Sequence, residues 1–396
     1  VLQTNPDSAA LHPGYTYKLK VNLMPISTLR IADFRNLIAV DISPCQQGLN
    51  VICGDNGSGK TSLLEVIYYL SLGKSFRSST ASRLINHTTD KFSIFSQLVN
   101  SQQIIPVGIE RSARGAPKMR IAGEDAASIA ELASLLPVRL IDVHSHDFFE
   151  TGPQCRRQYL DWGLFYLFDA FLPTWRQYER VLKQRNAILR DKRPKKELAV
   201  WTEELVKHAK ALDSMRREYV TLLTPLIVKA LNELLPISNI EIKYLPGWDE
   251  SLDFATILND AYLDEYRTGY TLHGPHRADL EVNIDGVPVK HFLSRGQQKL
   301  LICAMIIAQG MALTQHVNKA LIYLVDDLPA ELDLAGRHKL MGLLAKQNTQ
   351  IFMTAIEYSV IQPFIEDHIQ DLPVKVFHVE HGCVTESAQS LDLGCV

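Results

Sequence analysis

The sequence predicts an α/β fold organised around a phosphate-binding P-loop, with an attached antiparallel β-subdomain and an inserted helical lobe. Residues 54–61 read Gly-x-x-x-x-Gly-Lys-Thr and lie between an apolar strand and an apolar helix. A second apolar run ends in Asp326 and Asp327. Between about Cys155 and Leu235 the hydrophobic period becomes helical. The first two observations predict a nucleotide site, and the third predicts the lobe.

The composition is that of an ordinary globular chain. Its 396 residues, 46% of them hydrophobic, suffice for two or three domains with a sizeable core. The formal net charge of −3 gives no global attraction to nucleic acid, so a DNA-binding surface must be local. The cysteines form no Cys-x-x-Cys pair and indicate reduced, mostly structural thiols. The apolar stretch Leu300 to Leu313 is too short to cross a bilayer, and no signal-peptide pattern opens the chain, so we expect a cytoplasmic protein without a membrane partner.

The pattern divides the chain into four segments. Residues 1–23 lack a clear period and precede a well-patterned strand, so we expect an unstructured or appended extension there. Residues 24–150 are expected to form the first part of an ATPase head with its β-subdomain. Residues 151–238 are expected to form the inserted helical lobe, and residues 239–396 the second part of the head.

Local patterns predict the individual elements. Strands are expected at 26–37, 38–42, 92–99, 104–109, 118–121, 138–143, 240–245, 270–273, 276–289, 320–325 and 350–355, and helices at 62–72, 175–189, 195–223 and 300–312. Gly73 is expected to end the first helix, and Asp285-Gly286 to form a hairpin turn. The basic stretch from Arg190 to Lys196 reads as a bend at the tip of the lobe. A solvated loop and a contact with DNA or a protein partner are both open for it.

The P-loop is the most specific feature of the sequence. Its glycines let backbone N–H groups approach phosphate oxygens, Lys60 adds a positive charge, and Thr61 is placed to ligate Mg²⁺. The predicted nucleotide-binding residues are Gly54, Asp55, Asn56, Gly57, Ser58, Gly59, Lys60, Thr61 and Ser62. We therefore expect ATP and Mg²⁺ to bind here.

A second anion-seeking feature precedes the long apolar helix at 300–312. Ser294, Arg295, Gly296 and Gln297 stand where a helix begins, and Ser294 occupies an N-cap position. One P-loop already holds one nucleotide, so this segment is expected to act on the γ-phosphate bound to another protomer. Taken alone, the segment also fits a capped core helix.

The paired acids complete the predicted site. Asp326 is expected to hold Mg²⁺ directly or through water, and Asp327 to orient or deprotonate the attacking water, so that Lys60, Asp326 and Asp327 form the catalytic set. Asp333 is expected to reach toward a neighbouring protomer, and Thr354 ends the next buried strand with a hydroxyl.

At these residues the sequence resembles the ABC-type, SMC-like ATPase heads that act on DNA, and among them the RecF family of bacterial recombination and replication-gap repair. The resemblance covers Met24 to about Ser387. Besides the motifs above it includes Phe34-Arg35-Asn36, Gly73 to Ser78, Arg156 to Gly163, Leu182 to Asn186, His273 to Asp279, and Glu331-Leu332-Asp333.

The resemblance implies an ATP-dependent homodimer, with each nucleotide between one P-loop and the signature segment Ser294 to Gln297 of the other protomer. It further implies binding of single- and double-stranded DNA, slow ATP hydrolysis without DNA cleavage, work with RecO and RecR to load recombinase, and support of the SOS response.

The sequence departs from the wider ABC pattern at two positions. A hydroxyl, Thr354, stands where transporter ATPases have a histidine that contacts the γ-phosphate. The glutamine expected near the end of a core strand is absent, and only Asp142, His144 and His146 are at hand in its place, although a plain strand end is the simpler interpretation.

Further motif residues have alternative interpretations. Arg35 and Asn36 fit either a strand-end turn or a contact with the nucleotide. His276, Arg277 and Asp279 are expected to form a structural turn and ion pair rather than to take part in catalysis.

Two other protein classes were weighed. An ABC-linked nuclease of the overcoming-lysogenisation type would need an acidic metal-binding domain, for which the stretch after Asp333 gives no motif. A small-molecule P-loop kinase would leave the segment at Ser294 and the helical lobe unexplained.

Overall fold

Two compact units make up the protein in the computed structural model, which describes residues 24–100, 103–142, 147–319, 321–327, 332–369 and 372–387. Of these described residues, the head unit comprises those between 24 and 142, Glu233–Leu235 and those from Lys299 onward. The lobe unit comprises residues 147–232 and Pro236–Gln298. The expected N-terminal extension, residues 1–23, lies outside the described residues.

The head unit is built on a mostly parallel sheet with strand order β15-β14-β3-β13-β12-β8. The parallel strands are β3 (Gly48–Cys53), β8 (Val138–Ile141), β12 (Ile322–Val325), β13 (Gln350–Ala355) and β14 (Val374–Glu380), and β15 (Cys383–Glu386) pairs antiparallel with β14. Every residue of β3, β12 and β13 is buried, as their apolar runs predicted. Parallel strands share one carboxyl edge, so the segments that follow β3, β12 and β13 meet there.

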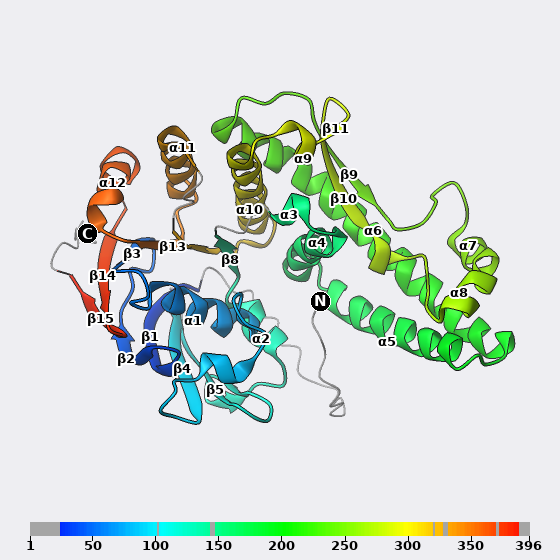
Figure 1. Ribbon diagram of the computed structural model, residues 1–396, viewed down its shortest axis with the longest axis horizontal. Helices are drawn as coiled ribbons and strands as arrows, with labels where there is room; N and C mark the ends of the chain where they lie inside the picture. The colour runs from blue at the N-terminus through cyan, green and yellow to red at the C-terminus, as the bar shows by residue number, and fades with distance from the viewer. Residues whose placement is uncertain are drawn as a thin grey trace. The chain divides into compact units, whose positions relative to one another are not determined.

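Helices cover both faces of this sheet. In Figure 1, α1 (Lys60–Leu72) lies on one face, and α11 (Leu334–Ala345) and α12 (Gln362–His368) lie on the other. Gly73 ends α1 as predicted, because it adopts φ 62° and returns its N–H to Tyr69. The remaining head helices are α2 (Ile129–Leu135), the 3₁₀ turns η1 (Ala81–Leu84) and η3 (Tyr358–Val360), and the part of α10 (Arg295–Val317) from Lys299 onward.

Helix α10 is longer than the expected 300–312. Among the described residues it is the one helix whose length and composition would allow it to cross a membrane, but 72% of its most apolar window is buried inside the protein. It therefore has the character of a core helix.

The β-subdomain of the head unit is an antiparallel sheet with strand order β2-β1-β4-β5-β6-β7. Its strands are β1 (Ile26–Phe34), β2 (Leu37–Ile42), β4 (Lys91–Val99), β5 (Ile104–Ser112), β6 (Lys118–Ile121) and β7 (Glu124–Asp125). One buried cluster contains Phe34 of β1, Ile67 of α1 and Phe352 of β13. Within it the rings of Phe34 and Phe92 meet edge to face, with their centroids 4.9 Å apart. This packing fixes the β1–β2 hairpin against the helix that follows the P-loop.

The lobe unit combines long helices with a small sheet. Its elements are α3 (Asp147–Glu150), α4 (Pro153–Leu167), α5 (Phe171–Arg190), α6 (Lys195–Leu234, as far as Asn232), β9 (Ile240–Leu245), α7 (Phe254–Asp260), α8 (Tyr262–Thr268), η2 (Pro275–Arg277), β10 (Asp279–Ile284), β11 (Val287–Pro288) and α9 (Val289–Phe292). The predicted turn at Asp285-Gly286 is confirmed, with φ 49° and 76° at the two residues between β10 and β11.

The lobe unit extends further along the chain than expected, into the segment 239–396 that was assigned to the head. Residues Pro236–Gln298 group with the lobe helices instead. Arg156 of α4 forms a 2.6 Å ion pair with Asp279 of β10, and Arg216 of α6 donates to the Pro275 carbonyl oxygen at 2.7 Å. Through these bonds the partly buried Arg156 and the buried Arg216 attach the small sheet and the η2 turn to the lobe helices.

One expectation about the lobe is wrong. No strand forms at 270–273, because the Asn186 side chain accepts hydrogen bonds from both the N–H and the hydroxyl of Thr271. Arg185 of α5 is buried and pairs with Glu265 at 2.6 Å, so it adds no exposed charge to the basic stretch from Arg190 to Lys196.

Candidate nucleotide-binding site

The phosphate loop connects β3 to α1 with a backbone that requires glycine. Gly54, Gly57 and Gly59 adopt φ values of 147°, 80° and 127°, which L side chains rarely allow. A Cβ on Gly54 would lie 2.3 Å from the carbonyl oxygen of Val379. The loop thus has the tight course that brings backbone N–H groups and the start of a helix to an anion.

Lys60 stabilises this loop from within. Its Nζ donates to the carbonyl oxygens of Gly54 (2.6 Å) and Asp55 (2.9 Å), and the residue is only 6% exposed. An ammonium group buried so deeply needs such oxygen partners. It is already positioned on the loop to which phosphates would bind.

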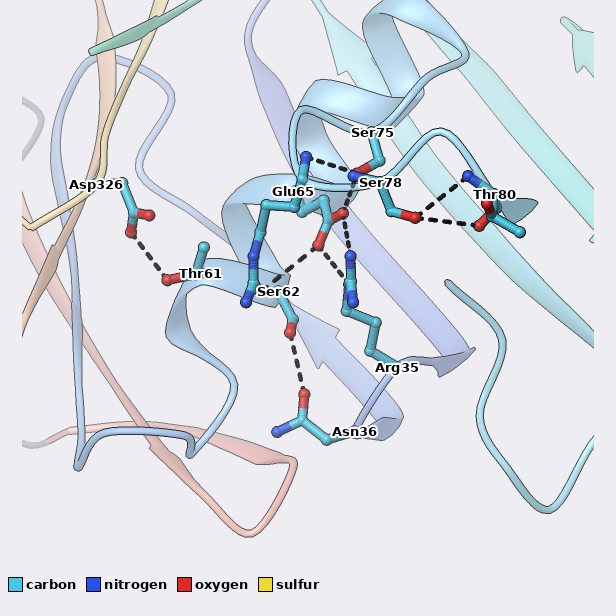
Figure 2. Close-up of polar contacts among 10 residues, drawn as sticks. Arg35, Asn36, Thr61, Ser62, Glu65, Ser75, Ser78, Thr80 and Asp326 are labelled. Carbon is cyan, nitrogen blue, oxygen red and sulfur yellow. Dashed lines mark hydrogen bonds and ion pairs between the residues drawn. The ribbon is translucent and has the colours of Figure 1, made fainter. Parts of the chain in front are cut away.

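The paired acids and the P-loop helix meet at one oxygen atom. Asp326 Oδ1 accepts hydrogen bonds from the hydroxyls of Thr61 (3.1 Å) and Thr354 (2.9 Å), and Figure 2 shows the bond from Thr61. The Thr354 hydroxyl in turn accepts from the Asp327 N–H at 2.7 Å. Residues from α1 and from the ends of β12 and β13 are therefore joined at the carboxyl edge of the sheet.

The surroundings of Asp326 suit a divalent cation. Burial raises the pKa of Asp326, the carboxylates of Asp327 and Asp142 act in the same direction, and the hydroxyls of Thr354 and Thr61 oppose them. Clustered carboxylates and a hydroxyl are hard oxygen ligands, and a cation would remove the penalty for charging them. The donor set therefore fits Mg²⁺.

Asp142 is the one candidate for the missing glutamine that lies within the described residues. It directly follows Ile141, whose carbonyl oxygen accepts from the Asp326 N–H at 2.9 Å. The carboxylate therefore stands near Asp326 across the parallel pair β8 and β12. His144 and His146 lie outside the described residues.

Arg35 and Asn36 differ in what they contact. Arg35 donates to both carboxylate oxygens of Glu65, at 2.6 and 2.7 Å, and Glu65 is fully buried. Asn36 contacts the phosphate loop itself, through the carbonyl oxygens of Gly57 and Ser58. For Arg35 the structure favours the strand-end interpretation over a nucleotide contact.

Glu65 is the residue that sequence reasoning missed. Its carboxylate also accepts from the Ser75 hydroxyl and lies 3.9 Å from Arg77, as Figure 2 shows for Ser75 and Arg35. It thereby ties the β1–β2 turn and the loop after α1 to the P-loop helix. The available signal was an acid flanked by Leu64 and Val66 on a helix that is apolar around its whole circumference.

The predicted signature segment lies in the lobe unit at the start of α10. The Gln297 N–H donates to the Ser294 hydroxyl at 3.3 Å, and the Ser294 N–H donates to Gln297 Oε1 at 3.0 Å. This is a capping box, so the N-cap prediction is confirmed. The remaining signature residues are Arg295, exposed, and Gly296, half-buried.

Asp333 also serves as a helix cap. Its carboxylate accepts from the Gly336 N–H at 2.7 Å at the start of α11, and the residue is exposed. Glu331 lies outside the described residues.

The motif around His276 is structural, as predicted. Asp279 forms the ion pair with Arg156, and His276 bonds to Tyr178 and to the carbonyl oxygen of Thr271, at 2.6 and 3.0 Å. Arg277 lies with its guanidinium 5.8 Å from the centre of the Tyr270 ring. These contacts are internal to the lobe.

The fold and this site define an ABC-type P-loop ATPase head with an antiparallel β-subdomain and a helical lobe. Residues 25–385 match the family model of the RecF/RecN/SMC N terminal domain. The DNA replication and repair protein RecF of Shewanella denitrificans is 42% identical over 362 residues, which cover 91% of this chain and 99% of that protein. RecF of Shewanella piezotolerans is 40% identical with the same coverage. The chain therefore belongs to the RecF family of DNA replication and repair proteins.

Solved structures agree on the fold. Two structures of the recombination mediator protein RecF in the RecFOR pathway, one with ATPrS and one with ATP, superpose with TM-scores of 0.79 and 0.81 and cover 93% and 94% of this chain. An Smc head bound to the C-winged helix domain of ScpA gives 0.56. The sequence identities of 23%, 22% and 14% limit this likeness to the fold.

Proposed function

We propose that this protein is an ATP-dependent DNA-binding protein of replication-gap and recombinational repair, which hydrolyses ATP slowly as a sandwich dimer. The observation that carries the proposal is the convergence of Thr61, Asp326 and Thr354 at one carboxylate oxygen beside a formed phosphate loop. Thr61 and Asp326 are 265 residues apart, so this geometry joins two motifs that ATPases of this class use together. The repair role is supported by the curated RecF relatives.

Each group at the site has a definite task. Residues 54–62 bind the phosphates through backbone N–H groups, and Lys60 neutralises phosphate charge. Thr61 and Asp326 would hold Mg²⁺, which neutralises charge that develops on the transferred phosphoryl group. Asp327 orients the attacking water and accepts its proton. Thr354 keeps Asp326 and the Asp327 backbone in register, because its hydroxyl bonds to both.

A second protomer completes the site. Ser294 to Gln297 supply a helix start to the γ-phosphate bound on the partner, and Asp333 reaches across the same interface. ATP favours the dimer only by contacting both protomers, so nucleotide binding and dimerisation are thermodynamically linked. The exposure of Arg295, Gln297 and Asp333 supports this arrangement.

Membership of the RecF family supports a wider proposed role. The closed dimer binds single- and double-stranded DNA in the cytoplasm, works with RecO- and RecR-type mediators to load recombinase, supports the SOS response and cuts no DNA. The structural relatives described as recombination mediators of the RecFOR pathway support the mediator role.

Two substitutions test the ATPase and the sandwich. Lys60→Arg and Asp327→Asn should each lower ATP turnover by about 100-fold or more, because one displaces the phosphate-binding charge and the other removes the base. Asp327→Asn should also retain ATP and accumulate as a dimer, measured by light scattering after size exclusion. Asp41→Asn, an exposed acid paired with Arg30 on the β-subdomain, should behave as wild type.

An Asp327→Asn protein that stays monomeric with ATP at micromolar concentration would refute the sandwich. Cleavage of plasmid DNA by the wild type with added Mg²⁺ or Mn²⁺ would favour the nuclease class instead. Within the described ranges, no group of three or more His, Cys, Asp or Glu side chains is arranged to hold a metal ion.

A further inference from the structure

One side chain of the β1–β2 turn, Asn36, forms hydrogen bonds to the outer side of the phosphate loop. Asn36 Nδ2 donates to the carbonyl oxygens of Gly57 (3.2 Å) and Ser58 (2.8 Å). Asn36 Oδ1 accepts from the hydroxyl of Ser62 at 3.0 Å, in the first turn of α1 (Figure 2). Carbonyl oxygens can only accept, so these partners fix which end of the amide is nitrogen.

The two bonds from Nδ2 set the orientation of two peptide planes. In a trans peptide the C=O and the following N–H point in opposite directions. With the carbonyls of Gly57 and Ser58 turned toward Asn36, the N–H groups of Ser58 and Gly59 turn into the loop. The Ser58 N–H there bonds to the Asp55 carbonyl oxygen at 3.2 Å. The loop interior thus receives donors, and two carbonyl dipoles that would repel a phosphate are held outside.

The turn that carries Asn36 packs closely against its neighbours although Asn36 itself is exposed. A Cβ on Gly59 would lie 3.0 Å from Asn36 Nδ2 and 3.0 Å from a methyl group of Leu37. On the other side, the Gly382 N–H donates to the Ser58 carbonyl oxygen at 3.3 Å, and a Cβ on Gly382 would lie 1.9 Å from the Asn36 carbonyl oxygen. The turns β1–β2 and β14–β15 therefore pack together on the outer side of the loop.

The turn that carries Asn36 is itself held in place. Arg35 adopts φ 54°, a strained conformation for a residue with a side chain. Its N–H donates to the Leu84 carbonyl oxygen at 2.7 Å, and its own carbonyl oxygen accepts from Asn86 Nδ2 at 2.8 Å. Its guanidinium is fixed by buried Glu65. These bonds offset the strain and present the Asn36 amide from a rigid support.

We propose that Asn36 is a positioning residue for nucleotide binding, whose amide holds the phosphate loop in its anion-binding conformation without contacting the nucleotide. The proposal deepens the function proposed above and rests on it. Pre-orienting the loop removes reorganisation that binding would otherwise require, so Asn36 contributes to affinity through the loop.

The test is the affinity of the full-length protein for a fluorescent ADP analogue. Asn36→Ala should weaken it by about 10-fold, the effect of losing two moderate hydrogen bonds. Asn36→Asp has the same size and keeps the acceptor for Ser62 but loses both donors, so it should weaken binding at least as much. Ser62→Ala should weaken binding less and add nothing to Asn36→Ala. Asn100→Ala is the matched control, since the Asn100 side chain accepts from the Gln103 N–H at 2.9 Å in the turn between β4 and β5.

Hydrogen exchange of the amides at 57–59 separates positioning from direct contact. Faster exchange in nucleotide-free Asn36→Ala supports the proposal, whereas wild-type exchange together with weakened binding would mean that Asn36 contacts the nucleotide, and would overturn it. Affinities within twofold of wild type for both Asn36 variants also overturn it. If Asn36→Ala does not fold, Asn36→Asp decides alone. Failure of the wild type to bind the analogue would instead refute the proposed function.

Discussion

At the scale of single residues, Glu65 determines how the P-loop helix is attached to its surroundings. A buried carboxylate needs strong ionic and hydrogen-bond partners, and Glu65, which is 0% exposed, has the bidentate guanidinium of Arg35 and the hydroxyl of Ser75. Such a pair adds little net stability compared with apolar packing, but removing one partner leaves the other charge buried. Arg35 is 21% exposed, so it has little water to replace the lost carboxylate.

We therefore predict that Glu65→Gln lowers the free energy of unfolding of the head unit by about 3–5 kcal/mol. Glu110→Gln is the control: Glu110 is one-third exposed and pairs with exposed lysines, so its loss should change stability far less. Unfolding is followed by far-ultraviolet circular dichroism. Tryptophan fluorescence monitors the lobe separately, because all four tryptophans lie between residues 162 and 248. Equal effects of the two substitutions would contradict the argument.

At the scale of elements, the junction of α5 with η2 depends on one neutral imidazole. The Thr271 carbonyl oxygen can only accept, so His276 Nε2 carries the proton, and Nδ1 must accept from the Tyr178 hydroxyl. Burial lowers the pKa of His276 to about 4, and the guanidinium groups of Arg277, Arg157 and Arg185 act in the same direction against the bond to Thr271. A proton on Nδ1 would make that nitrogen a donor, so the Tyr178 hydroxyl would have to accept and its own buried O–H would lose this acceptor.

The lobe should accordingly lose stability in acid. Between the ordinary histidine pKa of 6.5 and about pH 4, the folded lobe binds fewer protons than the unfolded chain. Its free energy of unfolding is thus fully present above pH 6.5 and falls with pH through this window, by up to about 3 kcal/mol. Urea unfolding followed by tryptophan fluorescence at pH 7.5 and pH 4.5 measures this. His276→Gln should flatten the pH dependence, and His291→Gln, on exposed α9, should not. An unchanged slope in His276→Gln would contradict the assignment.

The elements also show what a sequence can reveal. The P-loop, α1 and the strands of the head were predictable, because glycine spacing and apolar period are local properties of the chain. The lobe boundary was not, because the ion pair of Arg156 with Asp279 joins residues 123 apart. The strand predicted at 270–273 does not form for the same reason, since the side chain of Asn186, on the distant helix α5, accepts a hydrogen bond from the Thr271 N–H. Glu65 escaped notice because a charged residue on a helix ordinarily indicates the solvent face.

At the scale of the whole molecule, the proposed DNA binding must come from local surfaces. A net charge of −3 gives the chain no general attraction to phosphate. In the proposed ATP-bound dimer, two DNA-binding surfaces would be joined, so binding of the first would raise the local concentration of DNA at the second. DNA affinity should therefore follow dimerisation rather than the charge of a single protomer.

We predict that a non-hydrolysable ATP analogue tightens binding to a labelled duplex by at least about 10-fold, and that the affinity falls steeply with salt because phosphate contacts release counterions. Fluorescence anisotropy between 50 and 200 mM salt measures both.

The double substitution Arg190→Gln/Lys196→Gln tests whether the basic tip of the lobe contacts DNA, because it removes two exposed cations from the tip. A salt slope reduced by about two would assign the tip to DNA, and an unchanged slope would assign it to a solvated loop. A DNA affinity that changes with neither nucleotide nor salt would contradict an ATP-dependent DNA-binding dimer, because neither linkage nor counterion release would then operate.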